Sequence, residues 1–586
     1  MNIVLSIIVP VAAAVVLFAL PAKLNRTKTY LFLAAVLFNF AVAVIGYGKG
    51  FIFSAAAAVN PDMFFRNSPL SSFMIVVISV VALLSAVYAA ASMNENKQTH
   101  LFYGSVLLTI SFVNGVLFAD NFVIFLFFWE ALMIPMFLMI MSGESKPFDV
   151  AVKAFVISAI ADLFLMFGVM FLCIAGDSFS ISKCIAVLKM NGAYNSFTVI
   201  SFIMLFIGAA AKIGAMPFHS WIPEASVKAP VSFMVFMVTG VEKVLGVYLL
   251  IRITNDFFMI EPSSLLSISA MTFGIISALV ANALAVTQND FKKMLTYASI
   301  GQAGFMIVAI STMSVIGTIA ALIHMHAHII YKSSLFFVAG NIEKTEGTTD
   351  ISLVKGGLKK SMPYTFLAFL LSGASFAGIP FFYAFYSKEM IYESALGISW
   401  LFYACLLLST LFALISIIKW GSKLFFDNNG NNSKFEDKEV STWMFIPTII
   451  FSLACILFGL FHKVPLKIMC SVLNLKMPES HSALFAAMLV LISFAVLALA
   501  VINFVIAYRK KTDVSGYALP VLNKLGVVKL NANPGLDPYN IFIGYVKKMS
   551  GFLFILDKAL NYFYDFVIPA GIGEMARNTR KIHNGN

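Results

Sequence analysis

The sequence is poor in charge: Lys, Arg, Asp and Glu make up 12% of its 586 residues, whereas 60% are hydrophobic. A soluble domain cannot cover that much apolar surface with so few charged side chains. The mean hydropathy of +0.91 is instead typical of a protein that crosses a membrane many times.

Cysteine is also scarce, and its five residues are scattered without a CxxC spacing: Cys173, Cys184, Cys405, Cys455 and Cys470. Iron–sulfur clusters and structural zinc sites need clustered thiolates. A GxGxxG segment after a strand and a Walker A segment are missing as well. We therefore expect the chain to hold no cofactor and no metal, to carry no electrons and to hydrolyse no nucleotide by itself.

Long apolar stretches are what the sequence has in abundance, and they predict an all-α polytopic membrane protein. A scan for stretches of about 20 residues gives about 15 candidate spans. They lie near 3–20, 30–48, 71–92, 101–119, 121–141, 151–175, 197–213, 229–252, 264–287, 293–312, 315–339, 363–384, 399–419, 443–461 and 483–507. The first stretch has neither a basic start nor a small-residue cleavage site, so we interpret it as a retained span.

The basic residues predict an orientation. The loop after the first span carries Lys23, Arg26 and Lys28, and every second loop after it is basic again. The lysines of these later loops include Lys97, Lys146, Lys228, Lys292 and Lys511. By the positive-inside rule the N-terminus lies outside and the region after 507 is cytoplasmic, in a prokaryotic cytoplasmic membrane. These loops explain the net charge of +12, and we expect no nucleic-acid partner.

Ionisable residues occur in the middle of five predicted spans. Each costs on the order of 3 kcal/mol at mid-bilayer, so each needs a reason. They are Glu130, Lys212, the adjacent Glu242 and Lys243, the group His324, His328 and Lys332, and Lys388. The two histidines and the lysine of that group follow each other at intervals of four residues, which places them on one helix face.

Other interpretations of these residues are open. Lys212 and Lys388 could be lysines near helix ends that reach the membrane interface. His326 points away from its neighbours and is expected to be a packed core histidine. A haem or metal site on His324 and His328 lacks a second histidine pair. Taken together, buried acids and bases in five spans favour a proton valve, in which a moving carboxylate switches a lysine between its charged and neutral forms.

Two of the spans are broken in a similar way. Lys212 is followed by GAMPFHSWIP, and Lys388 lies in AGIPFFYAFYSKEM. Helices broken by Gly and Pro at corresponding positions of two halves are typical of inverted-repeat transporters with an ion site at mid-membrane. We therefore expect two inverted five-helix repeats, 101–252 and 264–419, between N-terminal helices in 1–100 and C-terminal helices in 443–507.

At this point the sequence resembles a known family over about 70–510: the antiporter-like subunits of respiratory complex I, Mrp-type antiporters and energy-converting membrane-bound hydrogenases. The segments that carry the resemblance are FWEALMIPMF, KAFVISAIAD, AAKIGAMPFHSWIPEA, GVYLLIR, DFKKMLTYASIGQAGFM, HMHAHIIYKSSLFF, GGLKKSMPYTF and AGIPFFYAFYSKEM. Eight matches in order make the resemblance specific.

The resemblance implies roles for individual residues in the first half of the chain. Glu130 and Lys212 would form the coupling pair of the first half-channel, and Asp162 matches an acidic position beside that pair. Members with this acid usually have an arginine three residues earlier, where this sequence has Ala159. An ion pair at that point is therefore not expected here.

For the second half, the resemblance implies a continuous polar axis. Lys243 would bridge the two halves, His324, His328 and Lys332 would continue the axis, and Lys388 would be the terminal lysine. Two features depart from complex I: the segment VKAPVSF replaces AGPTPVSA, and Lys243 occupies a position where the largest complex I subunit commonly lacks lysine.

The C-terminal region, 508–586, is polar at first and then apolar with interspersed charges. It resembles the lateral amphipathic helix of the largest antiporter-like subunits, although an ordinary surface-bound tail is the alternative.

The whole pattern predicts a proton- or sodium-translocating subunit of a redox-driven complex, either a membrane-bound hydrogenase or a complex I-like oxidoreductase. Its partners would be other membrane subunits and a peripheral arm with iron–sulfur proteins. The alternatives are an Mrp-type Na⁺/H⁺ antiporter subunit and, less favoured by lysines in so many spans, a stand-alone secondary transporter.

Overall fold

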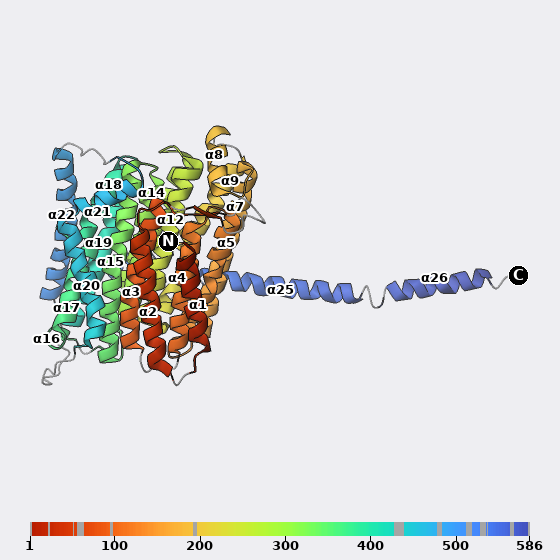
Figure 1. The fold of residues 1–586 in the computed structure, drawn as a ribbon, viewed down its shortest axis with the longest axis horizontal. Coiled ribbons are helices and arrows are strands. Elements are labelled where there is room, and N and C mark those ends of the chain that lie inside the picture. The colour runs from red at the N-terminus through yellow and green to blue at the C-terminus, as the bar shows by residue number, and fades with distance from the viewer. Residues whose placement is uncertain are drawn as a thin grey trace. The chain divides into compact units, whose positions relative to one another are not determined.

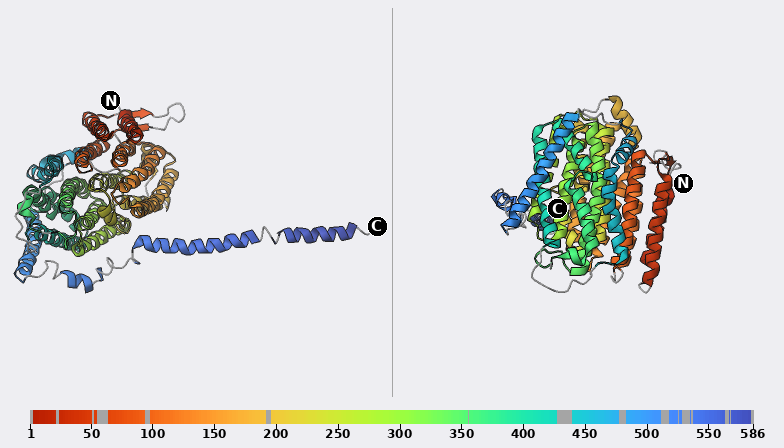
Figure 2. Two further views of the ribbon diagram at one scale, coloured as in Figure 1. Left: turned by 90° about the horizontal axis from the view of Figure 1, so that it is seen from below. Right: turned by 90° about the vertical axis from the view of Figure 1, so that its left-hand side faces the viewer.

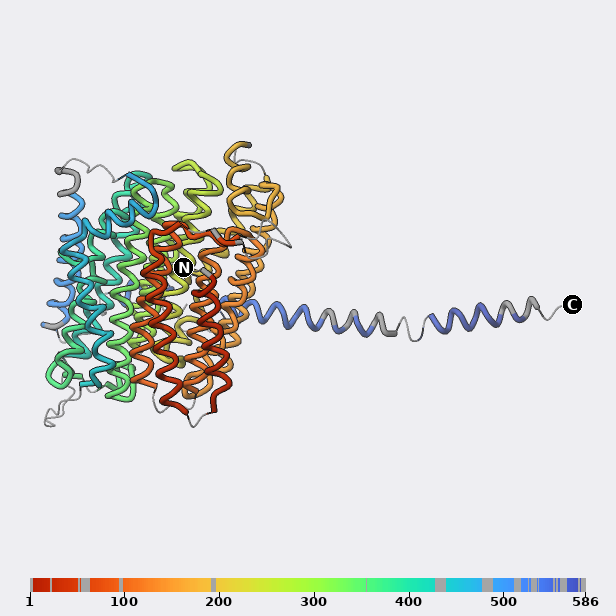
Figure 3. Tube along the Cα trace, in the orientation of Figure 1, coloured from red at the N-terminus to blue at the C-terminus, as the bar shows by residue number. Residues whose placement is uncertain are grey.

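A computed structural model describes most of the chain and is almost entirely helical (Figure 1, Figure 3). The described residues are 3–21, 24–50, 52–54, 64–93, 98–191, 196–354, 356–426, 439–476, 483–510, 518–524, 526–527, 535, 537–562, 566 and 568–583. Of the lysines used to predict the orientation, Lys23, Lys97 and Lys511 lie outside these ranges. The chain divides into two units, 1–528 and 529–586, which are described separately.

The first unit is a bundle of long helices. Its main helices are α1 (Ile3–Ala19), α2 (Asn25–Gly46), α3 (Pro69–Ser92), α4 (Thr99–Phe118), α5 (Phe122–Ala131), α6 (Met133–Met141), α7 (Phe148–Gly176), α9 (Ser196–Lys212), α12 (Glu242–Ile251), α13 (Leu265–Thr287), α14 (Phe291–Ser311), α15 (Val315–Glu346), α17 (Pro363–Ala377), α18 (Tyr383–Leu396), α19 (Trp400–Phe425), α20 (Thr442–Leu460) and α22 (Ala483–Arg509).

Short elements complete the unit: α8 (Ile181–Asn191), α10 (Ile222–Lys228), α11 (Val231–Phe233), the π-helices η2 (Met234–Val241) and η3 (Arg252–Phe258), α16 (Leu358–Ser361), α21 (Lys463–Val472) and α23 (Ala518–Lys524). The expectation of an all-helical chain misses one small sheet. Strand β1 (Ile52–Ser54) pairs with β2 (Phe64–Arg66) in antiparallel register, with Phe53 opposite Phe65.

The predicted spans correspond to helices. Twelve helical stretches in the described residues are long and apolar enough to cross a membrane, and three shorter apolar helices, in α1, α9 and α17, lie where three more spans are predicted. The chain is thus an integral membrane protein. The predicted span 363–384 is too long, because α17 ends at Ala377 and Gly378 takes a positive φ of 78°, a conformation that glycine accepts readily.

The predicted span 121–141 is interrupted at Leu132, which separates α5 from α6. Pro135 lies three residues further on, and a proline cannot donate to the carbonyl of the residue four positions before it, here Ala131. Sequence and geometry therefore agree on a local interruption two residues after Glu130.

Many of the helices begin at a polar residue whose side chain accepts a hydrogen bond from a free backbone N–H of the first turn. Ser68, Asn121, Ser264, Asp290, Ser314 and Ser399 cap α3, α5, α13, α14, α15 and α19 in this way. These caps fix where the apolar helices start. They thereby set how deep in the membrane each side chain of those helices lies.

Two matching pairs of backbone hydrogen bonds occur in the chain, one directly after α4 and one directly after α13. The Phe122 N–H donates to the Phe179 carbonyl, and the Ile181 N–H donates to the Asp120 carbonyl, at 2.9 and 3.0 Å. Later in the chain, the Phe291 N–H donates to the Thr349 carbonyl and the Ile351 N–H to the Asn289 carbonyl, at 3.0 and 2.9 Å. The first pair joins the residues at the start of α5 to those that follow α7. The second pair joins the residues at the start of α14 to those that follow α15.

One span is enclosed by the others. The stretch Val231–Phe258, built from α11, η2, α12 and η3, is completely buried over its most apolar part. Its α12 segment packs against α3, α9, α14 and α15, which come from both sides of it in the sequence. Seen end-on, the bundle shows the red-to-yellow helices and the green-to-cyan helices as neighbouring groups (Figure 2). The enclosed span therefore contacts both groups.

After α22 the chain returns to the bundle through α23. Leu522 of α23 is buried beside Ala283, Val286 and Ile415, on α13 and α19. The described residues of the second unit form two helices, α25 (Pro538–Tyr562) and α26 (Ile568–His583). Its α25 mixes apolar residues with Lys547, Lys548, Asp557 and Lys558, as expected for an amphipathic helix.

Candidate functional site

The site begins at the break in α9. The helix ends at Lys212, and Gly214 has a positive φ of 80° before α10 begins at Ile222. A broken helix leaves carbonyl groups without an intrahelical partner. The carbonyl of Ile213 instead accepts a hydrogen bond from Nζ of Lys243, a fully buried lysine of α12. The predicted bridging lysine is thus fixed to the backbone of the first break.

Trp129 joins the predicted acid and lysine of the first half. Its Nε1 donates to Oδ1 of Asp162 at 2.8 Å, and Nζ of Lys212 lies 4.9 Å from the centre of its ring. A cation at this distance from an indole face is attracted by the electrons of the ring. Asp162 and Lys212 are both buried, with exposed fractions of 3% and 8%. One aromatic side chain therefore positions both charged groups.

Glu130 and Glu242 complete this first cluster. Glu130, two residues before Leu132, is half-buried and close enough to Asp162 and Lys212 for their charges to interact. Glu242 is buried and interacts in the same way with Lys243, Lys212 and Asp162. Asp162, Lys212 and Glu242 line one small cavity of about 10 Å³, roughly the room that one water molecule needs.

The histidine stripe of α15 faces a matching stripe on α14. Three contacts join the two antiparallel helices in register: Lys332 Nζ donates to the Leu295 carbonyl (3.0 Å), His328 Nε2 bonds Ser299 Oγ (2.8 Å), and His324 Nε2 bonds Gln302 Oε1 (3.1 Å). His324, His328 and Lys332 have no exposed surface. The spacing of four residues, read from the sequence, does place them on one interior face.

The second break repeats the arrangement of the first. Lys388 of α18 is buried, and its Nζ donates to the carbonyl of Phe376 in the last turn of α17 at 2.7 Å. The ammonium groups of Lys332 and Lys388 lie 4.4 and 5.6 Å from the centre of the Phe376 ring. His324 Nδ1 bonds Ser387 Oγ at 2.9 Å, which connects the stripe on α15 to α18.

The titratable groups form a continuous series. Beyond the first cluster, Lys243 is close enough to His328 and Lys332 for charge interaction, His324 is close enough to Lys388, and Lys388 to its neighbour Glu389. Several buried polar atoms of the series have no hydrogen-bond partner among the described residues: Glu130 Oε1, Asp162 Oδ2, Glu242 Oε2, His328 Nδ1 and Glu389 Oε2. Buried groups of this kind bind ordered water in most proteins.

Some members of this series escape prediction from sequence. Trp129, Ser299, Gln302 and Ser387 carry no charge and look like ordinary residues of apolar helices. Their only signal is their spacing relative to the charged residues, such as Trp129 directly before Glu130. His326, expected to be a core residue, is only partly buried, and its Nδ1 bonds the hydroxyl of Tyr383 at 3.0 Å.

Fold and site define a class: a polytopic helical membrane protein with ionisable side chains buried between two broken helices. The family described as "NADH:quinone oxidoreductase/Mrp antiporter, TM" matches residues 119–416, about half of the chain. The chain belongs to this family, which confirms the resemblance seen in its motifs.

Among curated proteins, the chain is 29% identical to the Na⁺/H⁺ antiporter subunit A1 of Staphylococcus epidermidis over 409 residues, which is 65% of this chain and 50% of that protein. It is 28% identical to the NADH-quinone oxidoreductase subunit L of Buchnera aphidicola over 439 residues, 71% of this chain and 69% of that protein. The chain spans about half the length of the staphylococcal relatives that it matches.

Among solved structures, a chain of the Mrp complex from Dietzia sp. is similar with a TM-score of 0.71 and 20% identity, over 80% of this chain and 96% of that chain. This likeness establishes the fold of the helical bundle.

Proposed function

We propose that this protein is an ion-translocating, antiporter-like subunit of a redox-driven membrane complex, either a membrane-bound hydrogenase or a complex I-like oxidoreductase. The observation that carries the proposal is the unbroken series of buried titratable groups from Glu130 to Lys388 through Lys243. A buried ionisable residue in a membrane span is costly and is kept for a function. A whole series across the bundle fits movement of an ion along it.

The geometry gives the first cluster a way to move a proton. Lys212 lies over the indole ring of Trp129, within range of the charges of Glu130, Asp162 and Glu242. When a proton neutralises one of those carboxylates, Lys212 loses part of its counter-charge and releases its own proton more readily. A water in the cavity beside Lys212 would carry that proton towards Glu242 and Lys243.

Lys243 and Lys388 act at the breaks themselves. Each ammonium donates to a backbone carbonyl that the break has freed, that of Ile213 directly after α9 and that of Phe376 in α17. Loss of a proton from either lysine removes a charged donor from that carbonyl, and the broken helix is then held less tightly. Proton movement and local backbone position are thereby linked at two points of the bundle.

We propose that the bundle contains two inverted repeats of five spans, 101–252 and 264–419. The matched bonds at 120–122 with 179–181 and at 289–291 with 349–351 support this division, because they occur at equivalent points of the two segments. Five membrane crossings separate these points, so they belong to opposite ends of the bundle. The N-terminal helices of 1–100 and the C-terminal helices of 443–507 flank the repeats, which gives 15 spans in all.

The orientation and the partners are proposals too. The basic loops support an N-terminus outside and a cytoplasmic region after 507, in a prokaryotic cytoplasmic membrane. The mixed apolar and charged character of α25 supports a lateral helix within 508–586 that lies against neighbouring membrane subunits. A peripheral arm with iron–sulfur proteins would supply the energy.

A second candidate function is that of a subunit of an Mrp-type Na⁺/H⁺ antiporter. The relative from Staphylococcus epidermidis, itself a Na⁺/H⁺ antiporter subunit, supports it, as does Lys243 at a position where the largest complex I subunit commonly lacks lysine. Carboxylates and lysines can serve proton and sodium movement alike, so the two candidates share one site.

The test is purification of the intact complex through a tag on this chain, followed by flux measurements in sealed vesicles. Iron–sulfur subunits in the complex and proton or sodium uptake driven by its redox reaction are expected. A complex without redox subunits that exchanges Na⁺ for H⁺ would favour the second candidate. A chain that purifies alone and moves neither ion would overturn both.

A further inference from the structure

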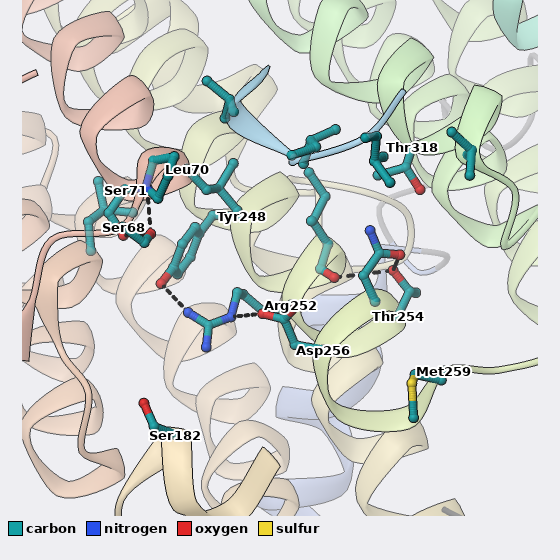
Figure 4. Close-up of a pocket in the computed structure, with 18 of the residues that line it drawn as sticks. Ser68, Leu70, Ser71, Ser182, Tyr248, Arg252, Thr254, Asp256, Met259 and Thr318 are labelled. Atoms are coloured by element: carbon teal, nitrogen blue, oxygen red, sulfur yellow. Dashed lines mark hydrogen bonds and ion pairs between the residues drawn. The ribbon is translucent and has the colours of Figure 1, made fainter. Parts of the chain in front are cut away.

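A large cavity lies at one end of the bundle. This cavity, here named the vestibule, has a volume of about 630 Å³ and is walled by the start of α3, the end of α4, η3, the start of α15 and the end of α21. Its lining is rich in hydroxyl, carboxamide and charged side chains, among them Ser71, Thr254 and Asn255 (Figure 4). On the orientation proposed above, these elements face the outside.

Arg252 is held at the wall of the vestibule by three neighbours. Its Nη1 donates to the hydroxyl of Tyr248 at 2.9 Å, and its Nε is 2.5 Å from a carboxylate oxygen of Asp256 (Figure 4). Its guanidinium lies 5.7 Å from the centre of the Phe257 ring. Only 17% of the side chain is exposed. The guanidinium is therefore a fixed positive charge and not a mobile surface group.

A second, apolar cavity shares part of its wall with the vestibule. It is lined by Tyr248 and Arg252, which it shares with the vestibule, and by Val169, Leu205 and Leu249, with phenylalanine side chains around them. Its volume is about 20 Å³. A narrow apolar space of this kind opposes the passage of water and ions.

The apolar cavity and the cavity of the ion site are bounded by the same three helices. The ion-site cavity is lined by Asp162 of α7, Lys212 of α9 and Glu242 of α12, and the apolar cavity by Val169, Leu205 and Leu249 of those helices. In each helix the two residues are seven positions apart, which means the same face and a separation of about 10 Å along the axis.

The direction of the offset is the same in all three helices. The α7 and α12 segments run towards the vestibule end and α9 runs away from it, so Val169, Leu249 and Leu205 each lie nearer that end than their charged counterparts. One seam between α7, α9 and α12 thus leads from the ion site, through the apolar cavity, to Arg252 and the vestibule.

We propose that this seam is a second access route, from the outside, to the Asp162–Lys212–Glu242 site, and that Arg252 keeps it closed to cations. The inference rests on the proposed function and adds a selectivity-determining residue to it. The fixed guanidinium neutralises the Asp256 carboxylate, which would otherwise attract Na⁺ and hydronium to the mouth, and the apolar cavity behind it excludes their hydration shells. Ions then cross only when the coupled reaction rearranges the three helices.

The test compares two arginines of the vestibule in the intact complex. Arg252→Gln removes the charge and keeps most of the side-chain volume, whereas Arg66→Gln removes the charge of a rim arginine that is 47% exposed and paired with Asp120 at 3.0 Å. Passive proton and sodium entry is measured in sealed right-side-out vesicles with the driving reaction stopped. Arg252→Gln should raise this leak on the order of tenfold, the effect of removing a unit charge at about 10 Å in a partly polar medium. Arg66→Gln should leave it unchanged.

A second measurement serves if Arg252→Gln does not assemble. Leu205→Cys places a thiol in the apolar cavity, and a membrane-impermeant cationic thiol reagent is added outside. Labelling of the chain without this substitution gives the background from the native cysteines. Labelling of Leu205→Cys should be slow when Tyr248 is present. It should be several-fold faster when Tyr248→Phe is added, because Arg252 then loses the hydrogen bond to the Tyr248 hydroxyl. Asn255→Cys, at an exposed position of the vestibule, should be labelled equally in both.

The outcomes separate the two proposals. An unchanged leak in an assembled Arg252→Gln complex that still shows driven flux overturns the route and leaves the proposed function standing. If Arg252→Gln does not assemble, equal labelling of Leu205→Cys with and without Tyr248→Phe overturns the route. Absence of driven flux in the unmodified complex overturns the proposed function itself.

Discussion

Nζ of Lys388 donates a hydrogen bond to the carbonyl oxygen of Phe376 at 2.7 Å, across the break between α17 and α18. The side chain thus takes the place of a backbone N–H that a continuous helix would supply. Gly378 makes the contact possible, since its positive φ turns the chain away, and a Cβ there would lie 3.1 Å from Cδ of Lys388. Lys243 and Ile213 form the same relationship at the first break.

Lys388→Met should strongly reduce driven ion flux while the complex still assembles. The substitution removes the titratable group and leaves the Phe376 carbonyl without its donor, at a cost of about 1–3 kcal/mol in stability. Flux in vesicles and subunit composition after detergent extraction are the two measurements. Lys467→Met, at an exposed position of α21, is the matched control. Full flux in Lys388→Met would mean that only the fold, and not the function, is symmetric.

Lys243→Met should interrupt transfer between the two halves. Lys243 is fully buried, and both Glu242 and His328 lie within range of its charge, so it connects the first cluster to the histidine stripe. Driven flux should fall to background. Retention of full flux would reduce Lys243 to a residue that merely satisfies the Ile213 carbonyl.

Glu130→Gln should abolish driven flux without loss of the complex. The amide has the shape of the carboxylate but cannot exchange a proton at neutral pH, and it no longer interacts with Lys212 as a charge. Glu144→Gln, at an exposed loop position, is the control for loss of one negative charge. Normal redox-driven acidification by the Glu130→Gln complex would contradict the pairing of Glu130 with Lys212.

Trp129→Phe separates the two contacts of Trp129. The phenyl ring keeps a face for Lys212, but the N–H that Asp162 accepts is lost. A hydrogen bond to a charged group contributes about 1.5–3 kcal/mol, so driven flux should fall by about tenfold or more rather than disappear. A rate equal to that of the unmodified complex would show that Asp162 needs no positioning.

Removal of the residues after Gly535 should weaken attachment to neighbouring subunits and leave the site intact. The surface that the apolar residues of α25 cover on neighbouring subunits would be left exposed. The measurement is the set of subunits that remains with the tagged chain in detergent. A second chain that ends at Phe566 retains α25 and lacks α26, and it shows which helix is needed. A complete complex after the longer truncation would leave 508–586 as a surface-bound tail.

The sequence predicts the breaks well because glycine and proline act locally. Gly214 with Pro217, and Gly378 with Pro380, cannot continue a helix wherever the rest of the chain lies. Long apolar helices and the charges within them are visible for the same reason. The stripe of His324, His328 and Lys332 is also local, since only the helical period is needed to predict it.

What the sequence does not reveal depends on contacts between distant helices. No local pattern shows that Trp129 bonds Asp162 or that Lys243 reaches Ile213. Hydropathy does not identify the enclosed span either: Val231–Phe258 and Leu265–Thr287 have the same mean value of 1.8, yet the first is 100% buried and the second 61%. Burial by protein and burial by lipid select the same apolar side chains, so composition cannot separate them.

A span without a lipid-facing side constrains how the protein is made. Val231–Phe258 leaves the ribosome before α14 and α15 exist, and it carries Glu242 and Lys243 at its centre. Until the later helices are inserted, these two side chains can contact only each other and the earlier helices within the hydrocarbon. The newly inserted first half is therefore an incomplete intermediate whose polar core stays open to lipid or water until synthesis of the second half closes it, and the two halves cannot mature as independent units.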